Sequence, residues 1–361
     1  MALTWEQVLA WRTERQFLTR LDGADATAVA RRLAGLQAQV PTSAALQVAV
    51  RQATPDLQAA AAGLADRSLI RTWVMRGTLH LLPTVVAPAY LSLLAHARSW
   101  HKGSWQKTFV RVDQVDTLAA AVTDALAGGA ALTRDELVAH VQESTGDADL
   151  VEHLASGWGT ILKPLAWQGI LCNGPSDGGR VTFTAPRTWS PAWTGLPAPG
   201  DAAPVVIDAY LGAYGPASPE SFDQWLIRGV TPKKALRGWF SRLQDAGTLV
   251  EVDVEGQRLL ARAHDVDALQ AARPHGTVRL LPGFDPTVLG PGTSDPHVVP
   301  VDHRADVSLA GGWIAPTVLR DGAVVGTWTL GPLGVRPFAP FNKADKAALR
   351  AETDRVAAII G

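Results

Sequence analysis

The clearest hydrophobic pattern lies in residues 205–263, where three amphipathic segments precede two short alternating ones. The first, Val205–Tyr214, ends at a Gly-Pro pair, and Ser218 followed by proline has the composition of a helix N-cap. The third segment has apolar side chains at helical spacing, at Leu236, Trp239, Phe240 and Leu243. Residues 249–254 and 258–263 then form a predicted β-hairpin. Three helices and a hairpin predict a winged helix.

The same plan recurs upstream, because turns of the type Gly-Ile/Thr-Leu begin at Gly77, Gly169 and Gly247, spaced 92 and 78 residues apart. We therefore predict three tandem winged-helix units, at residues 1–111, 112–189 and 205–273. A Pro/Gly-rich linker is expected over residues 190–204. In the second unit Thr133 and Glu136 have capping-box spacing, and a third helix is expected over Asp149–Trp167.

The pattern changes to short strands in residues 276–361. Strands are expected at residues 278–281, 298–301, 314–319 and 324–330, followed by a closing helix, Lys343–Ile360. Asp321-Gly322 is typical of a type I′ hairpin turn, since both residues tolerate positive φ. We predict an α+β protein with a C-terminal β-rich, barrel-like region.

Composition indicates an ordinary globular protein. Of the 361 residues, 47% are hydrophobic and 19% are charged, and Cys172 is the single cysteine. No apolar run has the length of a membrane span, and the N-terminus lacks a signal-peptide pattern. We therefore expect a cytoplasmic protein that does not associate with membranes.

The net charge of −1 conceals an asymmetry. Residues 1–111 contain 13 Lys+Arg and 6 Asp+Glu, whereas the remaining residues contain 20 and 28. Such segregation favours a basic face that meets phosphate. The candidate DNA contacts are Arg71, Arg76, Lys102, Trp105, Lys107, Lys233, Lys234 and Arg237. Each has a structural alternative. Arg71 and Arg76 could be solvated at strand ends, Trp105 could belong to the core, and the helix that carries Lys233, Lys234 and Arg237 need not face DNA.

Gln37 and Gln39 lie one residue apart between Gly35 and Pro41. On a helix, side chains at this spacing point roughly 200° apart, but in an extended chain they share one face. Since Gly35 and Pro41 indicate that the chain leaves the helix here, two neutral amides could grip one water molecule or one sugar. The alternative is two surface glutamines at a helix end.

No motif for a metal, nucleotide or activated serine is present. The nine histidines lack His-x₃-His spacing, and neither phosphate-binding loops nor a Gly-x-Ser-x-Gly elbow occurs. We expect no metal and no cofactor. From the residues alone, a non-catalytic DNA-binding protein or transcriptional regulator and a protein-interaction scaffold remain alternatives to an enzyme.

Five motifs together resemble the HTH_42 family of winged-helix DNA glycosylases, and the similarity covers nearly the whole chain. They are residues 36–39 (LQAQ), 71–80 (RTWVMRGTLH), 214–217 (YGPA), 281–285 (LPGFD) and 321–328 (DGAVVGTW). The resemblance implies a C-shaped arrangement of three winged helices and a catalytic Gln-x-Gln motif, here Gln37 and Gln39. Relatives in another branch carry an acid at the second position. Gln39 matches the self-resistance branch, whose activity is the unhooking of azinomycin cross-links.

The implied function is a monofunctional DNA glycosylase that hydrolyses the N-glycosidic bond of N7-alkylated purines, including interstrand cross-links. We expect it to act as a monomer on double-stranded DNA. His80, at the end of a wing strand, and the Asp321-Gly322 hairpin are further candidate DNA contacts. A base tied to the opposite strand cannot be rotated out, so we expect a shallow cleft at the glutamines.

Overall fold

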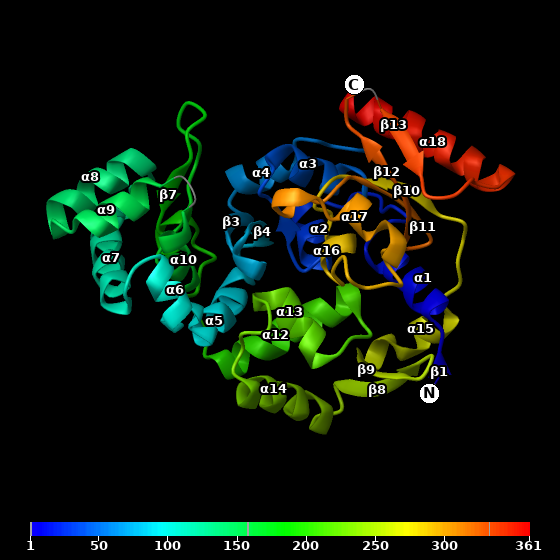
Figure 1. The fold of residues 1–361 in the computed structure, drawn as a ribbon, viewed down its shortest axis with the longest axis horizontal. Helices are drawn as coiled ribbons and strands as arrows, with labels where there is room; N and C mark the ends of the chain where they lie inside the picture. The colour runs from blue at the N-terminus through cyan, green and yellow to red at the C-terminus, as the bar shows by residue number, and fades with distance from the viewer. Residues whose placement is uncertain (1, 157–158, 332) are drawn as a thin grey trace.

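A computed structural model describes residues 2–156, 159–331 and 333–361. Figure 1 shows the helices of residues 112–189 as a lobe at one end, with the other elements packed together beside it. The α+β class is confirmed, since helices alternate with four small sheets. The winged-helix assignment of each unit and the C-shaped arrangement remain predictions.

The first unit combines helices with an antiparallel three-stranded sheet of order β2-β4-β3. Its strands are β2 (Leu36–Gln37), β3 (Leu69–Trp73) and β4 (Leu79–Pro83). The helices are α1 (Trp5–Arg15), α2 (Ala26–Arg32), α3 (Pro41–Ala49), α4 (Ala59–Ala65), α5 (Ala87–Ala97) and α6 (Gly103–Thr108).

The second unit has a capping box at the start of α8, as expected, because Thr133 and Glu136 bond each other's backbone. The expected helix Asp149–Trp167 is instead divided into α9 and α10, and residues 157–158 lie outside the described residues. Its sheet has the order β5-β7-β6. The elements are α7 (Val112–Ala125), β5 (Leu132–Thr133), α8 (Arg134–Thr145), α9 (Ala148–Ala155), α10 (Lys163–Trp167), β6 (Cys172–Asn173), β7 (Thr182–Thr184) and α11 (Pro186–Trp189).

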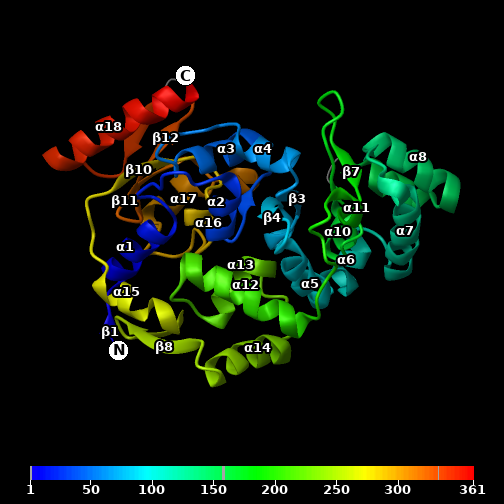
Figure 2. The same cartoon turned by 180° about the vertical axis from the view of Figure 1, so that it is seen from behind.

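The third unit follows the predicted order of helices and strands closely. It comprises α12 (Pro199–Tyr214), α13 (Pro219–Ile227), α14 (Lys233–Asp245), β8 (Leu249–Val254), β9 (Gln257–Arg262) and α15 (Val266–Ala271). Ser218 caps α13 by accepting from the Ser221 N–H, as its position before proline predicts. The N-terminal strand β1 (Ala2–Leu3) adds to this sheet in parallel with β8, so the start of the chain joins its third unit (Figure 2).

The C-terminal region contains an open antiparallel sheet of order β10-β11-β12-β13, and no closed barrel is found among the described residues. The expected strand at residues 298–301 is wrong, because Val298 and Val299 are buried in a loop. Both turn residues, Asp321 and Gly322, have the expected positive φ. The elements are β10 (Val278–Leu281), α16 (Pro286–Leu289), α17 (Arg304–Val307), β11 (Thr317–Arg320), β12 (Ala323–Thr329), β13 (Gly334–Pro337) and α18 (Lys343–Ile360).

Apolar side chains from different units share common cores. One cluster contains Leu82, Leu118 and Trp225, one residue from each repeated unit. A second joins Leu46 of α3 to Trp328 of β12. Burial of this kind fixes neighbouring units relative to one another, because each exposed CH₂ would cost about 0.8 kcal/mol. No helix in the described part of the chain is long and apolar enough to cross a membrane.

Candidate active site

The chain leaves α2 before it reaches the glutamine pair. Gly35 has φ +115°, which side-chain-bearing residues rarely adopt, and a Cβ there would lie 2.7 Å from Cε of Met75. The sharp turn at Gly35 directs Leu36 and Gln37 into β2, where they pair with Leu81 and His80 of β4. The prediction that the chain leaves the helix here is confirmed, and the extended part covers Leu36 and Gln37.

Gln37, His80 and Thr72 form one row across the sheet. Gln37 lies opposite His80, and His80 lies opposite Thr72, so all three side chains lie on the same face. They are 6%, 3% and 0% exposed. Oε1 of Gln37 and Oγ1 of Thr72 are buried and have no hydrogen-bond partner among the described residues. A buried oxygen without a hydrogen-bond partner costs free energy. These two oxygens are therefore available to accept a hydrogen bond from a bound group.

Gln39 belongs to the exposed end of the same segment. Pairing of β2 continues to Ala38, whose N–H donates to the Leu79 carbonyl at 2.8 Å. Oε1 of Gln39 accepts from the Leu79 N–H at 3.4 Å, and the side chain is exposed to solvent. Gln39 lies just beyond the end of β2, where the chain bends, so the segment has a buried amide at Gln37 and a solvated amide two residues further on.

Helix α3 is hydrogen-bonded to the Gln37 backbone. Nε2 of Gln47 donates to the Gln37 carbonyl at 3.1 Å, and the hydroxyl of Ser43 donates to the Gly283 carbonyl. One turn further on, Arg51 forms two hydrogen bonds to Asp285, at 2.8 and 2.7 Å. The residue 281–285 motif therefore supports α3, and α3 supports β2.

His80 is neutral at physiological pH. Burial, the largest cause, and the positive charge of Arg76 lower its pKa to about 3, opposed by its hydrogen bond to Thr78. Nδ1 lies 2.9 Å from the Thr78 carbonyl. Since a carbonyl only accepts, Nδ1 carries the proton and Nε2 presents a lone pair. The row of Gln37, His80 and Thr72 thus carries no formal charge.

This burial predicts acid sensitivity at His80. Between pH 6.5 and about 3 the unfolded chain binds a proton that the folded His80 does not, so stability falls as pH falls through this window. At pH 5 we expect a loss of about 2 kcal/mol relative to pH 7.5. Urea unfolding of wild type and His80→Asn at both pH values measures it: the asparagine variant should lack this loss. The assignment would be contradicted if wild type and His80→Asn lost the same unfolding free energy between pH 7.5 and pH 5. It would also be contradicted if the exposed His101→Asn control lacked this loss to the same extent as His80→Asn.

Three of the expected DNA contacts, Arg76, Asp321 and Gly322, have close contacts within the protein. Nη1 of Arg76 donates to the Trp225 and Leu289 carbonyls, both at 3.3 Å, so its guanidinium joins two other units rather than a phosphate. Burial lowers the Arg76 pKa to about 10. Asp321 accepts from the Thr277 N–H at 2.8 Å, and a Cβ on Gly322 would lie 2.9 Å from the Leu9 carbonyl oxygen. This turn packs against α1 and is not free to enter a groove.

The remaining candidate cations are not gathered at the glutamines. Arg71 lies opposite Leu81, which places it on the sheet face away from His80. Trp105 is half-buried against Phe109, with ring centroids 5.1 Å apart. The exposed cations are Lys102 and Lys107 at α6, and Lys233, Lys234 and Arg237 on α14. Neither α6 nor α14 packs extensively against the β2-β4-β3 sheet, since α14 packs on α12, α13 and β8.

Much of the basic excess in the first third of the chain is used internally. Seven of its arginines donate to backbone carbonyls or carboxylates: Arg12, Arg15, Arg20, Arg32, Arg51, Arg76 and Arg111. Sequence analysis also missed Thr72 and Gln47. The signal for Thr72 was available, since pairing the two strands around the Gly77 turn sets it opposite His80.

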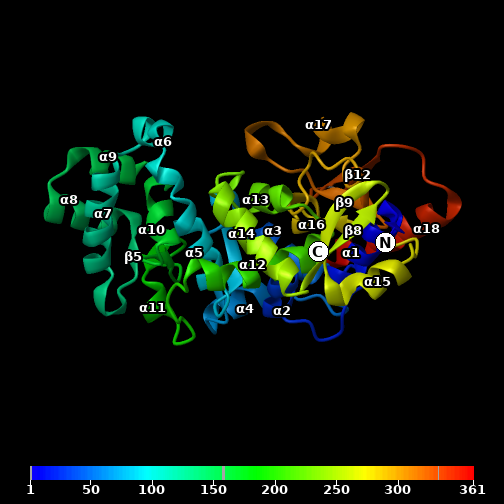
Figure 3. The same ribbon diagram turned by 90° about the horizontal axis from the view of Figure 1, so that it is seen from below.

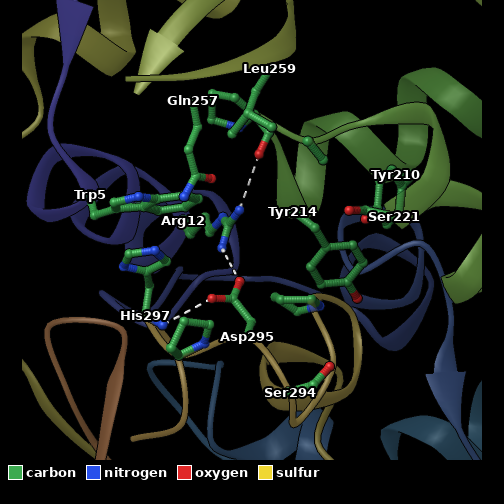
Figure 4. A pocket seen from close by; sticks show the side chains of 14 residues that line it. Trp5, Arg12, Tyr210, Tyr214, Ser221, Gln257, Leu259, Ser294, Asp295 and His297 are labelled. Carbon is green, nitrogen blue, oxygen red and sulfur yellow. Dashed lines mark hydrogen bonds and ion pairs between the residues drawn. The ribbon is translucent and has the colours of Figure 1, made fainter. Parts of the chain in front are cut away.

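A separate cavity of about 280 Å³ lies where α1, the third unit and the C-terminal region meet. Figure 4 shows the Arg12 guanidinium directed into it between Trp5 and Asp295. Arg12 donates to the Gly215 and Pro216 carbonyls, and Trp5 stacks on His297 at 3.9 Å. Tyr214, Pro216 and Ala217 of the residue 214–217 motif line this cavity, so the motif lies at the junction between units. In the described ranges, no group of acidic, histidine and cysteine side chains could hold a metal ion.

Comparison with known proteins gives the class of enzyme. A family model described as DNA glycosylase AlkZ-like matches residues 30–359. The interstrand DNA cross-link repair glycosylase of Streptomyces sahachiroi is 46% identical over 365 residues, which cover 100% of this chain and 98% of the relative. The solved structure of S. sahachiroi DNA glycosylase AlkZ matches with a TM-score of 0.95 and 46% identity, over 100% of this chain and 98% of that one.

The chain is therefore a DNA glycosylase. It belongs to the AlkZ-like family, and the resemblance carried by its five motifs is confirmed.

Proposed function

We propose that this glycosylase hydrolyses the N-glycosidic bond of N7-alkylated purines, including purines in interstrand cross-links such as azinomycin adducts. The observation that carries the proposal is the buried Oε1 of Gln37, which has no hydrogen-bond partner among the described residues, in the same segment as the exposed amide of Gln39. The relative from S. sahachiroi is named for repair of interstrand cross-links.

Alkylation at N7 makes neutral amides sufficient for this reaction. The alkylated purine carries a positive charge, so it departs neutral when the bond from C1′ to the base nitrogen breaks and its electrons move into the ring. No general acid is needed at the leaving group. The protein has to hold a water molecule in line with C1′, and fixing such geometry can supply several kcal/mol of the barrier.

The two glutamines have complementary roles in holding that water. The carbonyl oxygen of Gln37 accepts one of its hydrogens, while the Gln39 amide, at the solvent side, orients it and lets the released proton pass to bulk water. Neutral His80 keeps positive charge away from the developing oxocarbenium ion. Unmodified purines leave as anions, so this site selects cationic adducts.

Exposure of Gln39 supports action on a lesion that stays in the duplex. Five cavities of about 280 to 540 Å³ are lined by residues other than Gln37, Gln39 and His80. The exposed Gln39 suits action on a base that is tied to both strands and cannot be rotated out.

The direct test compares three duplexes: one with a single N7-methylguanine, one with an azinomycin-type cross-link, and one undamaged. We expect release of the alkylated base from the first and unhooking of the second, with intact abasic sites until alkali is added. Cleavage of the strand without alkali would contradict a monofunctional mechanism. Failure to release either adduct would overturn the substrate class.

We propose that the DNA backbone is contacted by Lys102, Trp105 and Lys107 and by Lys233, Lys234 and Arg237, acting in a monomer. The Lys102→Ala/Lys107→Ala variant should lower the slope of log affinity against log salt by about 2, because each phosphate contact releases roughly one counterion. Fluorescence anisotropy of undamaged duplex at several salt concentrations measures this. The exposed pair on α18, Lys343→Ala/Lys346→Ala, is the control. Equal slopes in both variants would exclude α6 from the interface.

A further inference from the structure

A second cavity, of about 540 Å³, lies among α1, α2, α5, α12 and the end of β9. Figure 3 shows α2 next to α12, and these elements are in contact. The cavity is separate from the candidate active site. Leu36, Leu81 and Val29 share one apolar cluster, so α2 covers the sheet face opposite to Gln37 and His80.

Guanidinium groups make up most of the polar part of the lining. Four arginines, contributed by three elements, meet one lining carboxylate, Asp208, and the apolar wall contains Val86, Tyr90 and Val205. The arginines are Arg15, Arg31, Arg32 and Arg262. The volume falls in the range of small-ligand sites, and the mixture of an apolar wall with convergent polar groups is typical of them.

Arg262 is a buried lining residue whose guanidinium is fixed by two carboxylates. It is 7% exposed, and its Nε and Nη1 donate to Asp265 and Asp208 at 2.5 and 3.1 Å. Its Nη2 is buried and has no hydrogen-bond partner among the described residues. The guanidinium rests on Gly212, where a Cβ would lie 2.5 Å from Nη1. Only a residue without a side chain permits this approach.

The other three arginines have no carboxylate partner in the part of the chain that the structure describes. Arg15 donates to the Gly212 carbonyl at 3.3 Å, Arg32 donates to the Arg15 carbonyl at 3.2 Å, and Arg31 is exposed. Burial lowers the pKa of Arg15 and of Arg32, and the charge of Arg262 lowers both further. With Asp208 and Asp265 as the paired acids, four cations face two anions, an excess of two positive charges.

We propose that this cavity binds a phosphate-bearing anion. A phosphate monoester carries between one and two negative charges at pH 7, which matches the excess, and guanidinium forks bind phosphate oxygens in pairs. The same chemistry has two sources, a free phosphorylated small molecule or the phosphates of a DNA strand outside the lesion. The inference does not depend on the role of Gln37 and Gln39.

Titration calorimetry of the full chain with inorganic pyrophosphate tests the site. Wild type should bind, and Arg31→Ala/Arg32→Ala should bind at least tenfold more weakly. Arg31→Ala alone removes an exposed side chain that makes no hydrogen bond to the described residues, so it should fold normally and weaken binding severalfold. This single variant keeps the test valid if the double variant misfolds. Arg350→Ala, an exposed arginine on α18, is the matched control, and Gln37→Ala/Gln39→Ala should bind pyrophosphate like wild type.

The affinity for undamaged duplex, measured in the same variants, distinguishes the two sources. Loss of pyrophosphate binding with unchanged DNA affinity assigns a free phosphorylated ligand. Competition between pyrophosphate and duplex, with weaker DNA binding in the double variant, assigns strand phosphates. Absence of pyrophosphate binding in wild type, or equal binding in Arg31→Ala/Arg32→Ala and Arg350→Ala, overturns the proposal.

Discussion

Replacing Gln37 and Gln39 together with alanine is expected to lower the rate of abasic-site formation on N7-methylguanine duplex by about 100-fold or more. Loss of a single preorganised hydrogen-bonding group in an active site costs roughly 100-fold to 1,000-fold in rate. Here both groups that position the water are removed, while the leaving group keeps its positive charge. Some release should therefore persist above the spontaneous rate, through binding and orientation of the DNA alone.

The single variants should differ because the two side chains differ in burial. The carbonyl oxygen of Gln37 is buried in the sheet without a partner in the described part of the chain, whereas Gln39 is exposed and its oxygen accepts from the Leu79 N–H. We expect Gln37→Ala to have the larger effect on the single-turnover rate constant, with DNA affinity changed less than twofold in both. Effects of groups that act together are not additive, so the double variant should be only slightly slower than Gln37→Ala.

Gln58→Ala is the matched control, since it removes an exposed glutamine of the same unit whose side chain makes no cap hydrogen bond. Alkaline cleavage of end-labelled duplex under single-turnover conditions gives the rate constants. A double variant with the wild-type rate would remove the glutamines from the mechanism. A parallel loss of rate and DNA affinity would indicate that they act in binding instead.

Local signals predicted the elements that local interactions specify. The capping box at Thr133, the Asp321-Gly322 turn and the closing helix Lys343–Ile360 all depend on residues a few positions apart, and each lies where expected. Strand β13 was missed because Gly334 and Pro337 are poor strand residues, tolerated at the edge of the sheet. Val298 and Val299 have the composition of a strand, but they are buried in the core and belong to none of the sheets.

The candidate site was predictable in part. Gly35 and Pro41 predicted that the chain leaves the helix at Gln37 and Gln39, because glycine permits a turn with positive φ and proline cannot lie inside a helix without disrupting it. The fate of the arginines was not predictable. Arg76 bonds to carbonyls 149 and 213 residues away, so nothing near it in the sequence distinguishes it from a phosphate contact. Long-range partners of this kind determine which cations are left for DNA.

Removal of the Arg51 charge is expected to have the largest effect on stability. Arg51 and Asp285 are fully buried and bond through two pairs of atoms, and Arg51 also donates to Thr287 and to the Gln16 carbonyl at 2.9 and 3.0 Å. Breaking a buried ion pair by removing one partner typically costs 3–5 kcal/mol, because the other charge is left unpaired. Arg51→Met should therefore lower the free energy of unfolding by about 3–5 kcal/mol.

A second substitution separates the unpaired charge from lost packing. Asp285→Asn keeps an oxygen for the Thr287 N–H but removes the charge, so Arg51→Met/Asp285→Asn should be more stable than Arg51→Met alone. Urea unfolding of the four proteins forms a double-mutant cycle, with Arg350→Ala as the exposed control. If Arg51→Met costs no more than Arg350→Ala, the pair does not hold α3 in place. Because Gln47 and Ser43 of α3 secure the Gln37 backbone and the 281–285 loop, the folded fraction of Arg51→Met should also release N7-methylguanine more slowly.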